Sequence, residues 1–433
     1  MLFDIVNAAA ARHRGEDHEK TIMNTGDSSS VHQKRQSRPA GPSSPAPVPA
    51  DTPGMTAFLV ACLTMLLLPA GLAALAPASI AMDSSPSAFD LAAPGYRYQF
   101  PEDHGAHERF RTEWWYYTGH LTSSAGRRFG FQLTFFRRGI PPEEVRTLPS
   151  QWSIRQLYLA HIALTDLENG RFLYADTLSR AGLGKAGAET GRLHVWIDRW
   201  SLSLDDAPTP RHHLQAATET FALDLALTPG KPVVVHGRNG ISRKGPAPGQ
   251  ASHYYSLTRL AAEGHIRLGT ETFVVTGLSW MDHEFGSADL ADNVVGWDWF
   301  SLQLSDSTEL MWYALRHADG SSDPASGGTL ILADGQTQPL RLEDLTIEPR
   351  AHWTSTRSGG RYPQRWRLRA PSLGLDLDVA SLLADQELDT ARSTGVTYWE
   401  GAVSASGAAR GAPVTGSGYV EMTGYAERVT PKL

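Results

Sequence analysis

The chain has 433 residues and a formal net charge of −7, so it lacks the basic excess expected of a nucleic-acid-binding protein. Its length allows two or three domains. The only cysteine, Cys62, lies in an apolar run, which excludes thiol catalysis, cysteine-ligated metals and internal disulfides from the rest of the chain.

The N-terminal segments predict export. Residues 1–54 are rich in Ser, Pro and Gly, so we expect them to be disordered or to precede a true start at Met55. Residues 55–82 form an apolar run long enough to cross a bilayer, as a cleaved signal peptide or a permanent signal anchor. Basic residues such as Arg38 precede this run and acidic residues such as Asp83 follow it. This asymmetry predicts a location in the periplasm or on the outer face of the inner membrane.

After residue 95 the sequence alternates apolar and polar residues between turn signals, which is typical of β-strands. RRFGFQLTFFRR (127–138) and LYLAHIAL (157–164) are two examples. In EWWYY (113–117), bulky residues occupy both faces of the strand, so both faces must be covered. A closed barrel meets this need, because one face lines the interior and the other meets a second layer. The sequence therefore predicts an all-β fold.

Two segments of similar design indicate an internal repeat. The run 113–137 resembles the run 296–316, with Trp114 corresponding to Trp297 and a shorter hairpin loop in the second copy. Two tandem β units are the simplest explanation. The predicted bodies are 95–285 and 286–430.

SWMDHEFGS (279–287) is the densest cluster of polar and aromatic residues. In a strand, Asp282 and Glu284 share one face with Trp280, whereas His283 lies on the other face. A carboxylate beside an imidazole can perform acid–base chemistry. The alternative is structural, since the same residues could join two barrels through buried hydrogen bonds.

Glu113 is a second candidate for chemistry. Beside Trp115 and Tyr117 its carboxyl would lose solvent and its pKa would rise, which suits a proton donor. The alternative is an ion pair with an arginine of the barrel, such as Arg137. We favour the ion pair, and we expect Trp115 and Tyr117 to face a cavity.

Sequence motifs for metals and cofactors are absent. PEDHGAHERF (101–110) carries histidines and acidic residues but does not have the spacing of a helical HExxH site. No G-x-S-x-G elbow, P-loop or G-x-G-x-x-G precedes a predicted helix, which argues against α/β-hydrolases, NTPases and dinucleotide enzymes. We therefore expect neither a metal nor a cofactor.

Several motifs, in order along the chain, carry a family resemblance. EWWYYTGHL, SHYYSLTRL, WMDHEFGS, GWDWFSLQL and GYVEMTGY together resemble the AttH family of exported lipocalin-like proteins, which is related to the carotenoid 1,2-hydratases (hydroxyneurosporene synthases). The resemblance covers about 95–430. It implies two calycin-type β-barrels in tandem, with an AttH domain over 95–285 and a second lipocalin-like domain over 286–430.

The resemblance also implies a chemistry. The hydratases protonate an isoprenoid double bond and add water to the resulting cation, with a site that combines a histidine, a tryptophan, a tyrosine and an aspartate. The histidine falls on His283 and the tyrosine on Tyr313, but Phe285 stands in place of the tryptophan. No aspartate lies near Tyr313, so the pattern is incomplete.

These observations lead to two hypotheses. The first is an exported binding protein that holds a hydrophobic ligand, isoprenoid or acyl-chain-like, in an aromatic cavity. The resemblance also implies a partner, because the family is associated with exporter-like membrane transport systems. The second is a cofactor-independent hydratase or isomerase, in which Asp282 or Glu284 donates a proton, His283 assists, and tryptophans stabilise positive charge. The predicted catalytic residues are Asp282, His283, Glu284 and Tyr313. The predicted ligand-binding residues are Glu113, Trp115, Tyr117, Trp280 and Trp299.

Overall fold

The structure is a computed structural model that describes residues 89–141 and 154–427. The predicted segments 1–54 and 55–82 lie outside the described residues. Within the described ranges, no helix is long and apolar enough to cross a membrane. The helices of these ranges are short 3-10 turns: η1 (Glu102–His104), η2 (Leu342–Asp344) and η3 (Pro371–Leu373).

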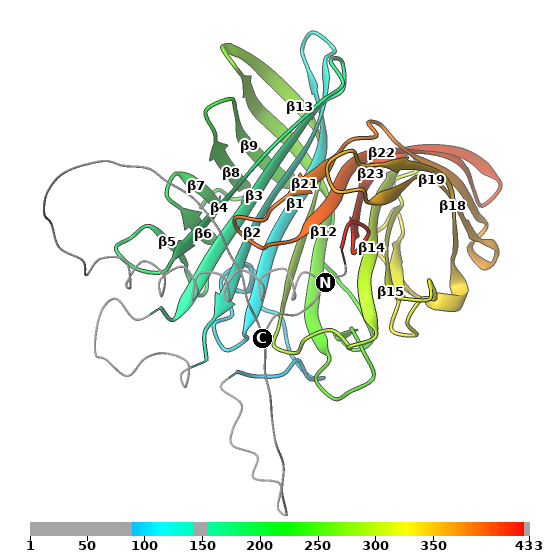
Figure 1. Cartoon of the computed structure of the whole chain (residues 1–433), viewed down its shortest axis with the longest axis horizontal. Coiled ribbons are helices and arrows are strands. Elements are labelled where there is room, and N and C mark those ends of the chain that lie inside the picture. The colour runs from blue at the N-terminus through cyan, green and yellow to red at the C-terminus, as the bar shows by residue number, and fades with distance from the viewer. Residues whose placement is uncertain (1–88, 142–153, 428–433) are drawn as a thin grey trace, which may run out of the picture. The chain divides into compact units, whose positions relative to one another are not determined.

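The first sheet contains thirteen strands, drawn from cyan to light green in Figure 1. They pair antiparallel in the order β4-β3-β2-β1-β13-β12-β9-β8-β7-β6-β5, and β10 and β11 pair with β12. Their bounds are β1 (Thr112–Ser123), β2 (Arg128–Gly139), β3 (Gln156–Asp166), β4 (Arg171–Arg180), β5 (Ala186–Ala188), β6 (His194–Ile197), β7 (Trp200–Leu204), β8 (His212–Ala217), β9 (Phe221–Pro229), β10 (Val234–Val235), β11 (Ser242–Arg243), β12 (Ala251–Leu268) and β13 (Glu271–Gly286).

The second sheet contains ten strands, in the order β17-β16-β15-β14-β23-β22-β20-β19-β18, with β21 paired to β22. Their bounds are β14 (Val294–Leu304), β15 (Glu309–His317), β16 (Gly327–Ile331), β17 (Thr337–Arg341), β18 (Thr346–Thr354), β19 (Arg361–Ala370), β20 (Leu375–Ser381), β21 (Glu387–Asp389), β22 (Thr397–Ala409) and β23 (Ala412–Thr423). Each sheet curls around its own apolar core, and the predicted all-β fold with two lipocalin-like barrels is confirmed.

The strand register confirms the internal repeat. In the first sheet β1 pairs with β2 and with the last strand, β13; in the second sheet β14 pairs with β15 and with the last strand, β23. Glu113 lies opposite Arg137, and Gly296 lies opposite Arg316 at the equivalent place. The two units therefore share their hairpin and the strand that closes against it.

The aromatic strand β1 divides its side chains between two cores, as the alternation predicted. Trp115 and Tyr117 are fully buried in the core of the first sheet. Trp114 and Tyr116 lie on the opposite face and pack in a separate core between the sheets, which also contains Trp299. Bulk on both faces of β1 is needed because the second sheet covers its outer face.

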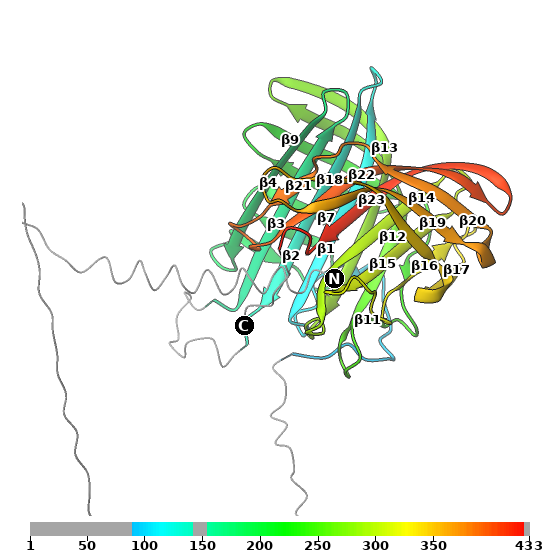
Figure 2. The ribbon, with the colours of Figure 1, turned by 45° about the vertical axis from the view of Figure 1, so that its right-hand side comes forward.

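The two sheets approach closely where β1 and β2 meet β22 and β23 (Figures 1 and 2). Gly130 on β2 permits this approach, because a Cβ atom there would lie 2.6 Å from Tyr419 Oη and 2.8 Å from Ala402 Cβ. Ion pairs reinforce the junction: Lys231 Nζ lies 2.6 Å from Glu309 Oε2, and Arg259 binds the other oxygen of the same carboxylate. The junction is thus both packed and polar.

Candidate functional site

A small cavity lies between the two sheets, where β1, β12 and β13 face β14 and β23. Its volume is about 10 Å³, which is room for about one water molecule. The lining combines four aromatic side chains with three carboxyls: Trp114, Tyr116, Tyr254, Trp299, Asp282, Glu284 and Glu421. Carboxyls in so apolar a setting are candidates for proton chemistry.

Asp282 is held by three hydrogen-bond donors. Tyr254 Oη donates to Oδ2 over 2.7 Å, and Trp280 Nε1 donates to Oδ1 over 2.7 Å. The hydroxyl of Ser256 donates to Oδ1 as well. Burial raises the pKa of Asp282 to about 7, with a contribution from nearby Glu284, although the three donors oppose the shift. The side chain therefore carries a proton at a higher pH than an ordinary aspartate does.

Glu284, the other acid considered as a proton donor, has a cation beside it. Lys244 Nζ lies 2.8 Å from Glu284 Oε1, and the Ser252 hydroxyl also donates to this carboxylate. Burial acts to raise the pKa of Glu284, but Lys244 and the hydrogen bonds outweigh it and the pKa is lowered. An acid held in its ionised form is a poor proton donor, so the geometry distinguishes Asp282 from Glu284.

Two further carboxyls face each other on the second sheet. Glu400 on β22 lies directly opposite Glu421 on β23, and Tyr116 Oη donates to Glu400 over 2.6 Å. Burial and the neighbouring carboxyls raise the pKa of Glu400, and burial above all raises that of Glu421 to about 7. Glu421 lies opposite Trp299 on the ladder, as Asp282 lies opposite Tyr116, so the repeat places equivalent acids of the two units at the cavity.

We expect the contribution of this carboxyl pair to the stability of the protein to fall as the pH rises from about 5 to about 8. The ordinary pKa of glutamate, 4.5, applies in the unfolded chain, whereas Glu421 in the folded state has a pKa of about 7. The stability that the neutral form provides is therefore complete below about pH 4.5 and is lost as the pH rises through about 7. In urea unfolding across this range, the free energy of unfolding of Glu421→Gln should rise relative to that of the parent as the pH increases, and the variant should be the more stable protein at pH 8.

The matched control is Glu343→Gln, which changes an exposed glutamate in η2. Its pH profile should follow that of the parent. An unchanged slope in Glu421→Gln would mean that the carboxyl pair is ionised in the folded protein and balanced by other groups.

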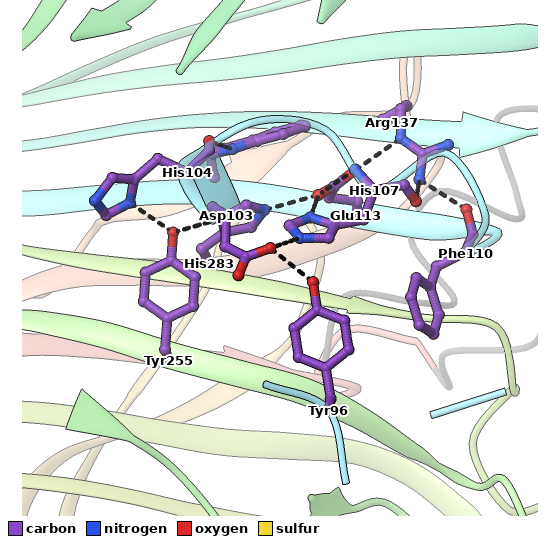
Figure 3. A network of polar contacts seen from close by, with 10 residues as sticks. Tyr96, Asp103, His104, His107, Phe110, Glu113, Arg137, Tyr255 and His283 are labelled. Carbon is purple, nitrogen blue, oxygen red and sulfur yellow. Dashed lines mark hydrogen bonds and ion pairs between the residues drawn. The ribbon is translucent and has the colours of Figure 1, made fainter. Parts of the chain in front are cut away.

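Asp282 faces the cavity between the sheets, whereas His283 lies on the opposite face of β13 and points toward Glu113 inside the first sheet (Figure 3). Its Nε2 is 2.8 Å from Glu113 Oε1, and its Nδ1 is 2.8 Å from Tyr255 Oη. The predicted assistance of His283 to Asp282 is therefore wrong, because adjacent residues of a strand point to opposite faces. The imidazole near Asp282 belongs to His236, whose Nε2 lies 2.6 Å from Ser256 Oγ.

Glu113 forms the ion pair that the sequence analysis favoured. Arg137 Nε lies 2.9 Å from Glu113 Oε2, and both side chains are fully buried. Burial acts to raise the pKa of Glu113, but Arg137 and His107 overcome it and hold the pKa well below its usual range. These neighbours favour the ionised form of Glu113, which is a poor proton donor.

Of the remaining predicted residues, some lie inside the first sheet and others lie between the two sheets. Trp115 Nε1 donates to the His104 carbonyl over 3.0 Å, and Tyr117 Oη lies 2.8 Å from His212 Nδ1, both inside the first sheet. Trp280 and Trp299 lie between the sheets, with ring centroids 6.3 Å apart.

Tyr313 belongs to the region between the sheets, where it contacts Lys244. The Lys244 ammonium lies 4.6 Å from the centre of the Tyr313 ring, and the phenol donates to the Ala325 carbonyl over 2.9 Å. The ring thus faces the cation that pairs with Glu284.

Sequence reasoning missed several polar residues of this site, among them Lys244, Tyr254, His236 and Glu421. The internal repeat contained a signal for one of them. Continued to the closing strands, it pairs WMDHEFG with YVEMTGY and so sets Glu421 beside Asp282. Lys244 and His236 come from short connecting strands and loops, and no spacing in the sequence indicates that they reach the cavity.

Comparison with known families adds to this geometry. The family model described as AttH-like matches residues 91–425. The chain belongs to the AttH-like family. A crystal structure of a putative AttH protein from Nitrosomonas europaea is 37% identical to this AttH-like chain, covers 78% of it and 100% of its own length, and superposes with a TM-score of 0.69.

Two more distant structures share the AttH-like fold. Kievitone hydratase from Nectria haematococca is 17% identical, with a TM-score of 0.59 over 79% of this chain and 98% of its own. CghA, solved with Sch210972, is 14% identical, with a TM-score of 0.50 over 79% of this chain and 97% of its own. A search of curated protein sequences found no match to this chain.

Proposed function

We propose that this AttH-like protein binds an unsaturated apolar molecule, of isoprenoid or acyl-chain type, between its two sheets and transfers a proton to it. The observation that carries the proposal is the position of Asp282. Its buried carboxyl is fixed by Tyr254, Ser256 and Trp280 at a cavity with aromatic walls. A buried acid that pairs with no cation among the described residues is a suitable donor to a carbon atom.

The chemistry balances without a cofactor. The Asp282 hydroxyl gives its proton to one alkene carbon, and the π electrons of the double bond form the new C–H bond. The second carbon becomes cationic, and the faces of nearby Trp280 and Trp299 stabilise that charge. A water molecule bonds to the cation and returns a proton to the Asp282 carboxylate, so that the net change is the addition of water. Loss of a proton from a neighbouring carbon instead would give isomerisation.

The size of the cavity sets a condition on this function. It has room for about one water molecule, so a substrate enters only if aromatic side chains of the lining move aside. The water site and the acid are therefore in place before the apolar substrate arrives. Kievitone hydratase shares the fold of this chain, which agrees with the proposal.

The second candidate is a carrier that holds the same class of ligand without converting it. The aromatic lining is sufficient for such binding, since apolar walls with a few polar groups are the usual design of ligand sites. In this case the buried carboxyls would serve only to join the sheets. Export across the inner membrane through segment 55–82, and delivery by an exporter-like transport system, remain predictions from the sequence under both candidates.

One experiment separates the two candidates. Purified protein is extracted with organic solvent to identify bound apolar molecules by mass spectrometry, and is then incubated with geranylgeraniol or oleic acid in D₂O. Acid catalysis predicts a product with one carbon-bound deuterium, together with an added water if the reaction is hydration rather than isomerisation. Co-extraction of an apolar molecule, with both probes recovered unchanged and free of deuterium, would favour the carrier and contradict the enzyme.

A further inference from the structure

A second group of polar side chains lies inside the first sheet, apart from the cavity between the sheets. Three donor atoms, His107 Nδ1, Glu113 Oε1 and His283 Nε2, lie within 4.8 Å of one another. His107 follows η1, Glu113 is on β1 and His283 is on β13. The distances from Glu113 Oε1 to the two ring nitrogens are 2.7 and 2.8 Å.

The outer ring nitrogens of the two histidines also have fixed partners (Figure 3). His107 Nε2 lies 3.0 Å from Asp103 Oδ1, and His283 Nδ1 lies 2.8 Å from Tyr255 Oη. Metal-binding histidines usually have their second ring nitrogen held in this way, by a carboxylate or another acceptor, which fixes the tautomer and the direction of the ring.

The cluster also has a route to solvent. A cavity of about 710 Å³ reaches His107 and is lined by residues that include Tyr96 and Asp103. The His107 side chain is 10% exposed, whereas those of Glu113 and His283 are fully buried. An ion could therefore enter on the His107 side and keep an open position toward the cavity.

We propose that His107, Glu113 and His283 form a binding site for a divalent transition-metal ion of the zinc type. Two imidazoles and one carboxylate are a donor set that suits this class of ion. Donors around such an ion lie about 3.3 Å apart, given metal–ligand distances of about 2.0–2.2 Å. Binding therefore moves the two rings away from Glu113 by about half an ångström. The remaining proton of each ring then lies on the outer nitrogen. His107 donates a hydrogen bond from this nitrogen to Asp103, and His283 donates one to Tyr255.

The test uses untagged protein that has been treated with a chelator and dialysed. Titration with Zn²⁺ should show one tight site per chain by calorimetry and should raise the melting temperature. Titration with Co²⁺ should produce the intense visible absorption of a four-coordinate complex. His107→Ala should abolish the binding of Zn²⁺ and the visible absorption with Co²⁺. Asp103→Asn should weaken Zn²⁺ binding by about 10–100-fold.

His194→Ala is the matched control, because His194 is a surface histidine that also lies 2.7 Å from a carboxylate, Glu189. It should bind Zn²⁺ as the parent does. The fold of His107→Ala is checked by its circular dichroism and its unfolding curve in the absence of metal. Failure of the parent to bind Zn²⁺ stoichiometrically, or equal binding by folded His107→Ala, would overturn the proposal. Neither result bears on proton transfer by Asp282, which lies on the other face of β13.

Discussion

Glu113→Gln should lower the free energy of unfolding by about 3–5 kcal/mol. Glu113 and Arg137 are both fully buried, and the carboxylate also accepts a hydrogen bond of 2.9 Å from the backbone N–H of His107. Glutamine keeps the size of the side chain but removes the charge, so the guanidinium of Arg137 remains buried without a counter-ion. Urea unfolding of the parent and the variant at neutral pH measures the difference.

Glu189→Gln provides the control for this experiment. Glu189 also contacts an arginine and a histidine, but its side chain is 42% exposed. Surface changes of this kind usually alter stability by no more than about 0.5 kcal/mol. If Glu113→Gln were as mild as Glu189→Gln, the two carbonyls that accept hydrogen bonds from Arg137 would be sufficient to hold its charge.

Asp282→Asn should reduce the turnover of an unsaturated substrate by about 10²–10⁴-fold, the usual contribution of a general acid. Asparagine has the same shape: its Oδ1 can still accept hydrogen bonds from Trp280 and Ser256, and its Nδ2 can donate to the Tyr254 hydroxyl, but it has no acidic proton to give. Because burial already favours the neutral form of Asp282, the neutral amide should leave the stability nearly unchanged. Steady-state rates and unfolding curves are measured on one preparation.

Asp298→Asn is the comparison for Asp282→Asn. Asp298 lies on the other face of β14 from Trp299 and pairs with Arg316 over 3.1 Å, so it does not line the cavity. We expect this variant to lose stability and to keep its turnover once folded. A loss of stability in Asp282→Asn without any turnover in the parent would assign Asp282 to the junction between the sheets.

The parts of the fold that could be predicted from the sequence depend on local periodicity. Side chains alternate along a strand, so the assignment of Trp115 to one core and Trp114 to another needed no knowledge of distant residues. The repeat could be found for the same reason, because each unit carries its own hairpin. The ion pair of Glu113 with Arg137 joins directly opposed residues of one hairpin, β1 and β2.

The parts that could not be predicted depend on how the sheets curl and meet. Lys244 reaches Glu284 across a gap of forty positions in the chain, and Tyr116 donates to Glu400 on the other sheet. The expected cooperation of Asp282 with His283 rested on nearness in sequence, whereas adjacent residues of a strand point to opposite faces. His107 joins His283 only because the segment after η1 folds against the end of β13, which no spacing reveals.

The two-faced strand β13 has a consequence for protein engineering and for natural variation. Its even-numbered positions 280, 282 and 284 serve the region between the sheets, and position 283 serves the histidine cluster. Libraries randomised at alternate codons should thus retune one site while leaving the other intact. A single-codon insertion or deletion within this stretch would exchange the two sets of side chains and damage both sites at once. Length changes should therefore be tolerated at the hairpin tip between β12 and β13, whereas the middle of β13 should evolve by substitution alone.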